Sequence, residues 1–511
     1  MASCMERAKV ESRCMSDLIG LDHRALDRAR VSRDSRFDGK FFIAVTSTGI
    51  YCRPICPSRT SKSANVRYYP NAASAAEAGF RPCLRCRPEA APGTPAWLGT
   101  SAVVRKALRL IEGGALDEVP VEALAERLGI GSRHLDRLFL QHVGASPLAV
   151  AQTRRLQFAK RLLDETNLPI TEIALAAGFG SVRRFNDVFQ ETYQRSPREM
   201  RKHRRDRGET RDGDDVALKL AFRPPYDWEQ VLGFLATRAV AGIEHVDANR
   251  YSRTIDLMGT SAVITVKPIE GEDALELRVR GAPPASLFQL SAVARRVFDL
   301  TADPEHIAGA MKSDKLISSL MKRRPGVRIP GTWDPFECVV RAVLGQQVSV
   351  AAGRTFTARL VARLGQRIAS GAEGLTHLFP RPEAIADADL TGLGFTGARQ
   401  AALRAVARAV IERRLDFNAP ADEVTECLAS LSGIGPWTAQ YVALRALGEP
   451  DAFPAGDVVL RRIAGGKGAA MSTRALEERA EAWRPWRGYA AQHLWVAAKD
   501  VIRTRGSRLR S

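Results

Sequence analysis

The sequence predicts a multidomain α+β protein, and three observations support that prediction. The chain has 511 residues, enough for about three or four ordinary domains. Hydrophobic residues make up 45% of it, which is ample for true cores. The spacing of apolar residues also changes along the chain, from helical over 97–205 to short alternating runs over 216–298 and back to helical over 299–505. These changes divide the chain into separate modules.

Residues 1–35 are predicted to be an N-terminal extension, in which Met15 is a candidate internal start and residues 1–14 are dispensable. The first 20 residues lack the apolar core of a secretion signal. No apolar run reaches the roughly 18 residues that a membrane span needs. We therefore expect no membrane partner.

Residues 36–89 are predicted to form a small α/β module that binds a metal ion. Its four cysteines stand in two close pairs about two dozen residues apart, the spacing at which a chain wraps one tetrahedral Zn²⁺ with thiolates. They are Cys52, Cys56, Cys83 and Cys86. The apolar run 41–45 predicts a strand that leads into the first pair. On spacing alone, a zinc ion that only holds the fold is favoured over a reactive one, and no organic cofactor is expected. Thiolate ligands need a reducing compartment, which predicts a cytoplasmic protein.

Residues 97–205 are predicted to be all-α, with two related halves. The segment 120–132 is matched by 169–181, because each has an amphipathic helix, a turn with glycine and a second helix opened by a serine N-cap. Two helix-turn-helix units fit this pattern, and a helical bundle is the alternative. The second helices each present a polar, basic face that favours DNA, formed by Arg133, His134, Arg137, Arg183, Arg184 and Asn186. Residues 206–215, a charge run, are predicted to be a solvated linker that lets the two halves of the chain move independently.

The formal net charge of +19 indicates a polyanionic partner. Basic residues that neutralise phosphates release counterions, so double-stranded DNA is the expected partner. A protein that simply uses arginine liberally is the alternative on charge alone.

The C-terminal half is predicted to consist of a small β-rich domain, residues 216–298, and an all-α domain, residues 299–505. Within the second, Gly433 and Gly435 alternate in a turn between two helical stretches. Glycines there let the backbone approach closely, and the following helix presents N–H groups to a DNA phosphate. The isolated acid Asp457 follows about twenty residues later. Alone, Asp457 fits the N-cap of a helix better than a catalytic group.

The metal module resembles the amino-terminal domain of the Ada adaptive-response regulators, on the Arg- and aromatic-rich stretches 48–54 and 79–83. The paired helix-turn-helix units resemble the AraC-type DNA-binding domain. The Ada resemblance implies that Cys52 accepts a methyl group from a methylated DNA phosphate while Cys56, Cys83 and Cys86 remain ligands. Methylation would lower the negative charge of the site, so that Arg59, Arg81 and Arg85 could grip promoter DNA more tightly. The resemblance to a regulator adds RNA polymerase as an expected further partner.

The C-terminal half resembles the AlkA-type 3-methyladenine DNA glycosylases of the helix-hairpin-helix superfamily. The segments that match are 222–228, 341–349, 431–439, 453–462 and 483–495. The resemblance implies that Asp457 is catalytic and that Trp437, Tyr441, Trp495 and Phe234 line a base pocket. Gln347 stands at the position of the intercalating wedge, where an apolar residue is also found. Trp437 stands where bifunctional relatives place a lysine, which implies simple hydrolysis without strand cleavage.

The chemistry of such a site follows from general principles. Cleaving an N-glycosidic bond builds oxocarbenium character on the sugar, and a nearby carboxylate stabilises that charge or activates water. Aromatic faces attract a cationic alkylated purine once it is flipped out, at about 0.5–2 kcal/mol each. Each aromatic residue has an ordinary place in the core as its alternative, most evenly so for Phe234.

The chain is therefore predicted to be a monomeric fusion of an Ada-like methyl acceptor and regulator with an AlkA-like glycosylase. No Pro-Cys-His-Arg motif is found, so repair of O6-alkylguanine is not expected. Two alternatives stay open. The chain is a transcription regulator with an inactive glycosylase half, or a glycosylase whose front half only tethers it to DNA.

Overall fold

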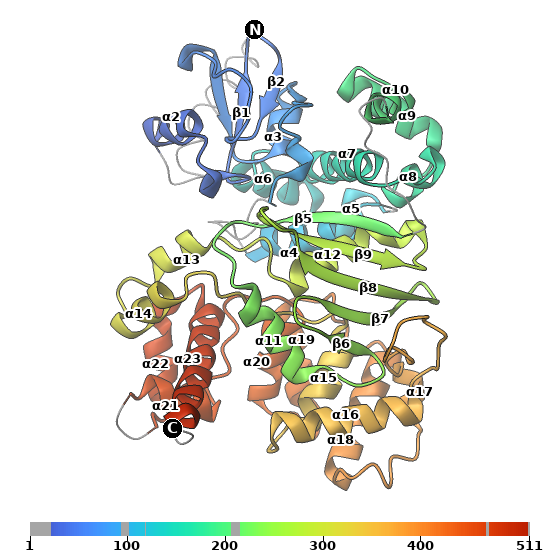
Figure 1. The fold of residues 1–511 in the computed structure, drawn as a ribbon, viewed down its shortest axis with the longest axis vertical. Helices are drawn as coiled ribbons and strands as arrows, with labels where there is room; N and C mark the ends of the chain where they lie inside the picture. The colour runs from blue at the N-terminus through green and yellow to red at the C-terminus, as the bar shows by residue number, and fades with distance from the viewer. Residues whose placement is uncertain (1–21, 93–101, 118, 206–214, 467–469, 509–511) are drawn as a thin grey trace. The chain divides into compact units, whose positions relative to one another are not determined.

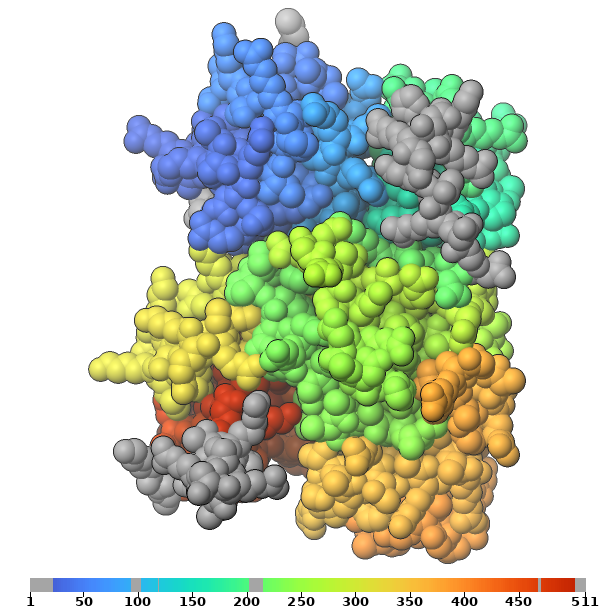
Figure 2. Space-filling model, in the orientation of Figure 1, coloured from blue at the N-terminus to red at the C-terminus, as the bar shows by residue number. Residues whose placement is uncertain are grey.

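The computed structural model describes residues 22–92, 102–117, 119–205, 215–466 and 470–508. The chain divides into two compact units, one formed by residues 1–224 and 271–292, the other by residues 225–270 and 293–511 (Figure 1). Figure 2 shows one face of the molecule with all atoms drawn, coloured along the chain from the N-terminus to the C-terminus. No helix in the described part of the chain is long and apolar enough to cross a membrane.

The first unit begins with a four-stranded sheet of order β3-β1-β2-β4. Its strands are β1 (Phe42–Val45), β2 (Ile50–Cys52), β3 (Val66–Tyr69) and β4 (Arg81–Pro82). The strand predicted at 41–45 is confirmed as β1, which pairs antiparallel with β2 and β3, while β2 and β4 run parallel. The helices α2 (His23–Ser32) and α3 (Ala72–Glu77) cover two apolar clusters of the sheet. α2 lies in the range predicted as an extension, and its Leu26 and Ala29 are buried in the core.

A run of helices follows within the first unit. They are α4 (Ala102–Glu112), α5 (Val121–Arg127), α6 (Ser132–His142), α7 (Pro147–Glu165), α8 (Ile170–Ala176), α9 (Val182–Tyr193) and α10 (Pro197–Arg205). The predicted repeat is present as α5–α6 and α8–α9, each joined by a turn with a left-handed glycine, Gly129 or Gly178. Ser181 caps α9 by accepting from the backbone N–H of Arg184 at 3.1 Å. The matching serine cap predicted for α6 is wrong, because Gly131 is the N-cap and Ser132 is already helical.

The first strand after the linker, β5 (Val216–Ala221), pairs antiparallel with β9 (Ala274–Arg280). It does not lie free. The Glu165 carboxylate at the end of α7 accepts from the Lys219 backbone N–H at 3.0 Å, and Arg161 donates to the Lys219 carbonyl at 2.6 Å. β5 is thus held on α7 within the first unit by these two contacts to its main chain.

The second unit combines an antiparallel meander with a helical domain. The meander consists of β6 (Glu244–Val246), β7 (Tyr251–Leu257) and β8 (Thr260–Pro268). Its helices are α11 (Trp228–Arg238), α13 (Pro304–Ala310), α14 (Lys315–Arg323), α15 (Pro335–Leu344), α16 (Val350–Leu364), α17 (Pro382–Ala386), α18 (Gly397–Ile411), α19 (Ala421–Ser430), α20 (Pro436–Arg445), α21 (Val458–Ala464), α22 (Thr473–Ala480) and α23 (Arg487–Arg508); α12 (Leu287–Val297) begins in the first unit and ends in the second.

The core of the helical domain lies among α15, α18, α19 and α20, which pack side by side (Figure 1). α19 and α20 form the predicted helix-hairpin-helix, joined by the turn at 431–435. Buried ion pairs join the meander to α15, since Arg253 contacts Glu337 at 2.8 Å and Arg341 contacts Glu244. α15 in turn packs against α20, the second helix of the hairpin, so these ion pairs link the meander to the helix-hairpin-helix.

Candidate functional site

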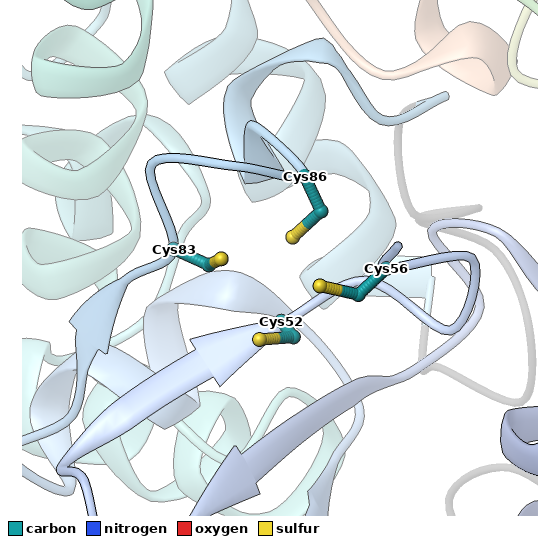
Figure 3. A group of neighbouring side chains, drawn as sticks. All are labelled: Cys52, Cys56, Cys83 and Cys86. Carbon is teal, nitrogen blue, oxygen red and sulfur yellow. The ribbon is translucent and has the colours of Figure 1, made fainter. Parts of the chain in front are cut away.

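The four predicted metal ligands come together at one end of the zinc-module sheet. Their sulfur atoms all lie within 4.8 Å of one another, and Figure 3 shows the side chains facing one another. Cys52 ends β2 and Cys83 follows β4, and the backbone N–H of Cys83 donates to the Tyr51 carbonyl at 2.9 Å. The parallel pairing of the two strands therefore brings one cysteine of each close pair to the same place.

This cluster has the size and the donor set of a tetrahedral four-thiolate zinc site. Cys83 and Cys86 are buried, whereas Cys52 and Cys56 are partly exposed, so the first pair is the accessible one. Crowding of the thiols raises the pKa of Cys52 and lowers the pKa of Cys56, in each case chiefly through the hydrogen bond between these two. The residues present fit one Zn²⁺, which Cys52, Cys56, Cys83 and Cys86 hold.

Arg53 anchors the loop that holds the first cysteine pair. Its backbone N–H donates to the Cys86 sulfur at 3.3 Å, and its guanidinium donates to the buried Asp38 carboxylate at 2.8 Å. Hydrogen bonds of this kind orient the ligands of a metal and tune their charge. Sequence reasoning missed Asp38, because nothing in the local pattern links it to a cysteine loop 15 residues away.

The predicted DNA-contacting side chains of the first unit are all exposed. Arg59, Arg81 and Arg85 surround the cysteine cluster in sequence, and none of them is buried. On the second helices of the two helix-turn-helix units, the exposed residues are Arg133, His134, Arg137, Arg183, Arg184 and Asn186. On the opposite face of these helices, Leu135, Phe139, Phe185 and Phe189 are buried. Each second helix thus turns its apolar side inward and its basic side to solvent.

The hairpin between α19 and α20 needs glycine at Gly433. This residue has φ +84°, and a Cβ there would lie 2.9 Å from the Cβ of Ala402. Gly435 has an ordinary φ of −90° and is the N-cap of α20, and a Cβ added to it would meet nothing within 4 Å. Gly433 is therefore required by packing, whereas Gly435 leaves open space at the start of the helix.

Gln347 lies in the turn between α15 and α16, exposed and with a left-handed φ of 54°. The preceding residue, Gln346, donates through its side chain to the Gly433 carbonyl at 3.0 Å and to the Thr438 hydroxyl at 3.1 Å. The predicted wedge position and the predicted phosphate-binding hairpin are thus held beside each other, although 87 positions separate Gln346 from Gly433.

The Asp457 carboxylate is fixed through both of its oxygens. Oδ1 accepts from the backbone N–H groups of Val459 at 2.8 Å and Leu460 at 3.0 Å, which makes Asp457 the N-cap of α21. Oδ2 accepts from the indole Nε1 of Trp437 at 3.1 Å. The helix-cap interpretation of Asp457 is therefore correct, and it coexists with an orientation that leaves the carboxylate against an aromatic ring.

The four predicted base-pocket residues gather around the same place. Trp437 and Tyr441 stack with ring centroids 5.3 Å apart, and Tyr441 meets Trp495 edge to face at 6.4 Å. Phe234 comes from α11, on the other side of the meander in sequence, and joins them through a shared neighbour, Arg445. We call these four rings the aromatic cluster.

Arg445 is the residue beside the aromatic cluster that sequence reasoning missed. Its guanidinium carbon lies 4.5 Å from the ring centroid of Phe234, 5.1 Å from that of Trp495 and 5.6 Å from that of Tyr441. The residue is 2% exposed. Arg445 follows Tyr441 by four residues and Trp437 by eight, which places all three on the same face of α20. This spacing is the sequence signal that could have identified Arg445.

Comparison with known proteins gives each segment a family. The metal binding domain of Ada matches residues 25–89, a helix-turn-helix domain 124–203, the AlkA N-terminal domain 217–334, and the HhH-GPD superfamily base excision DNA repair protein 340–487. A solved 3-methyladenine DNA-glycosylase from Archaeoglobus fulgidus is 23% identical, covering 55% of this chain and 98% of that chain with a TM-score of 0.49.

Two curated relatives share most of their length with this chain. A Mycobacterium tuberculosis (strain H37Rv) protein, "Probable bifunctional transcriptional activator/DNA repair enzyme AlkA", is 42% identical over 479 residues, 93% of this chain and 96% of the relative. The Escherichia coli (strain K12) "DNA-3-methyladenine glycosylase 2" is 36% identical over 281 residues, 54% of this chain and 95% of the relative.

Fold, site and family models together define a DNA-binding protein that joins a four-thiolate zinc module and a double helix-turn-helix to a helix-hairpin-helix glycosylase domain. The chain belongs to the family of bifunctional AlkA-type transcriptional activator/DNA repair proteins, as its 42% identity over nearly the whole length of the mycobacterial member shows.

Proposed function

We propose that this protein is a monofunctional DNA glycosylase that excises alkylated bases such as 3-methyladenine, fused to a methyl-accepting transcriptional regulator. The single observation that supports the glycosylase most strongly is the Asp457 carboxylate, fixed by two backbone N–H groups on one oxygen and by the Trp437 indole on the other. A carboxylate that served only as a helix cap would not need an aromatic donor from a second helix.

In the proposed reaction, the damaged nucleotide leaves the duplex and its base rests against the aromatic cluster. The bond between the sugar C1′ and the base nitrogen breaks, and its electron pair goes to the base. Positive charge develops on the sugar, where Asp457 stabilises it. A water oxygen then bonds to C1′ and its proton passes to the carboxylate, leaving an abasic sugar and the free base.

The DNA backbone is proposed to bind at the hairpin of α19 and α20. Gly435 opens the N-terminus of α20 without a side chain, so a phosphate can approach the first backbone N–H groups of that helix. Gln347, held beside the hairpin through Gln346, fills the gap that the flipped nucleotide leaves. Trp437 supplies no amine for a Schiff base, so hydrolysis stops at the abasic site.

In the zinc module, Cys52 is proposed to accept a methyl group from a methylated DNA phosphate. Bound zinc keeps the thiols of the cluster deprotonated at neutral pH. The Cys52 sulfur forms a bond to the methyl carbon, the bond from that carbon to the phosphate oxygen breaks, and the oxygen leaves with the electron pair as a phosphodiester anion. The partial exposure of Cys52 and the burial of Cys83 and Cys86 support this choice of acceptor.

Methylation of Cys52 removes one negative charge from a site flanked by the exposed Arg59, Arg81 and Arg85. Repulsion of DNA phosphates falls and promoter binding tightens, while the second helices at Arg133–Arg137 and Arg183–Asn186 read the operator in the major groove. Recruitment of RNA polymerase, a cytoplasmic location and a monomeric state complete this proposal.

Base release from alkylated duplex DNA tests the glycosylase directly. The whole chain should release alkylated purines, and Asp457→Asn should not. Asp387→Asn is the matched control, because the Asp387 side chain is 85% exposed and lies directly after the last residue of α17. It should release alkylated purines like the unmodified chain. Release by Asp457→Asn at the unmodified rate would overturn the role of the carboxylate, and release by neither protein would leave a regulator with an inactive glycosylase half.

A further inference from the structure

Arg445 is a buried cation with aromatic rings for neighbours. Its guanidinium donates to the Pro330 carbonyl at 3.0 Å and to the Gln492 side-chain oxygen at 2.7 Å. Its Nε has no hydrogen-bond partner. Among the described residues, no carboxylate forms an ion pair with it. A buried cation that no carboxylate neutralises is costly, and here two hydrogen bonds and three aromatic faces offset that cost.

The charge is also fixed. Burial lowers the pKa of Arg445 to about 10, which still leaves the guanidinium protonated at neutral pH. Arg238, one turn after Phe234 on α11, adds a second guanidinium 4.0 Å from the Phe234 ring centroid. The side of the aromatic cluster formed by Phe234 is therefore positively charged.

The opposite end of the cluster is negative. Trp437, Tyr441 and Arg445 follow one another at four-residue spacing along one face of α20, and the Asp457 carboxylate is hydrogen-bonded to the first of them. A helix rises about 1.5 Å per residue, so roughly 12 Å separates the start of this row from its end. The row thus runs from a carboxylate, across stacked rings, to a buried guanidinium.

We propose that Arg445 is an electrostatic positioning residue that favours departure of the base, acting through the rings of Tyr441, Trp495 and Phe234. This inference rests on the proposed glycosylase function. Breaking the C1′–N bond moves an electron pair toward the base and leaves positive charge on the sugar. A fixed cation behind the base and a carboxylate beside the sugar both favour that direction of charge movement.

The consequence differs with the charge of the lesion. A cationic base such as 7-methylguanine is repelled by Arg445 while bound, and that repulsion disappears as the base leaves neutral. A neutral base such as hypoxanthine is not repelled while bound, and Arg445 stabilises the negative charge that develops on it. Two unit charges about 10 Å apart at an effective dielectric constant near 20 alter a rate or an affinity roughly tenfold.

The test uses single-turnover kinetics of the full chain on two duplexes, one with a single 7-methylguanine and one with a single hypoxanthine. Arg445→Met keeps the length of the side chain and removes its charge. We expect the maximal rate to fall about tenfold on both substrates. The half-saturating protein concentration should fall on 7-methylguanine and stay level or rise on hypoxanthine. Arg445→Lys should restore most of the rate.

Two further variants keep the test decisive. Arg238→Met changes a half-buried position and provides a test even if Arg445→Met unfolds. It should change the maximal rate and the half-saturating protein concentration on each substrate in the same directions as Arg445→Met, by a smaller factor. Arg474→Met, at a side chain 89% exposed, is the matched control for loss of one charge and should leave both substrates unchanged.

The inference would be overturned if Arg445→Met changed the maximal rate and the half-saturating protein concentration equally on the two substrates, and if Arg445→Lys restored neither. Arg445 would then have a merely structural role. An unmodified chain that releases neither base would instead refute the proposed glycosylase function, so the two failures are distinguishable.

Discussion

Alanine substitutions at the two glycines of the hairpin, Gly433 and Gly435, should cause different defects, one in stability and one in DNA binding. Gly433→Ala places a side chain at φ +84°, in the left-handed region, where an L-residue costs about 1–2 kcal/mol. Its Cβ would also lie 2.9 Å from the Cβ of Ala402 on α18. Overpacking of that kind costs about 1–3 kcal/mol more. The variant should therefore lose about 2–5 kcal/mol of unfolding free energy.

Gly435→Ala is the matched partner, because its φ of −90° suits alanine and nothing lies within 4 Å of the added Cβ. It should keep the stability of the unmodified chain and lose affinity for duplex DNA, since the methyl group occupies the approach to the N-terminus of α20. Urea unfolding of both variants measures the first effect, and fluorescence anisotropy with a short abasic duplex measures the second. Equal stabilities of the two variants would refute the packing argument, and unchanged DNA binding by Gly435→Ala would refute the phosphate-binding role.

Three further outcomes follow from other sites. Burial raises the pKa of Asp299 to about 6, so between about pH 4 and pH 6 this carboxyl keeps its proton in the folded chain and loses it in the unfolded chain. The free energy of unfolding should therefore fall as the pH rises through this range, by up to about 3 kcal/mol. Urea titrations at several pH values should show this fall in unfolding free energy in the unmodified chain and not in Asp299→Asn. An identical pH dependence in both proteins would show that Asp299 is not its source. Removal of zinc by a chelator, or Cys83→Ser, should unfold the zinc module, a loss on the order of 10 kcal/mol that circular dichroism and metal analysis would detect; an unaltered spectrum of the metal-free chain would contradict it. In the unmodified chain the Lys219 backbone N–H donates to the Glu165 carboxylate at 3.0 Å. Glu165→Ala should remove this hydrogen bond, speed hydrogen exchange at the Lys219 amide and leave Arg161 buried without its acidic neighbour. Exchange as slow as in the unmodified chain would show that β5 does not depend on this contact.

Periodic and spaced features could be predicted from the sequence. The strand β1, the paired helix-turn-helix units and the cysteine cluster follow from apolar alternation, helical period and ligand spacing, all of which are local. The serine cap of α6 was predicted wrongly because a repeat in sequence does not guarantee a repeat in backbone geometry. Ser132 is the first residue of α6, whereas Ser181 stands just before α9 as its cap.

Features that depend on distant segments could not be predicted. Arg445 becomes part of the site only because α11, α20 and α23 bring Phe234, Tyr441 and Trp495 to its guanidinium. The contact of Arg161 with Lys219 likewise joins residues 58 positions apart across the charged linker. The local composition of neither segment indicates that contact.

Two separate chemistries are proposed for this one chain, methyl uptake at Cys52 and base excision at Asp457. The most direct measurement treats the unmodified chain, Cys52→Ser and Asp457→Asn with the same methylated duplex DNA, and scores both the mass of the Cys52 peptide and the number of abasic sites. We expect the unmodified chain to gain one methyl group and make abasic sites, Cys52→Ser to make abasic sites only, and Asp457→Asn to gain the methyl group only. A single variant that abolishes both, while remaining folded, would contradict the account.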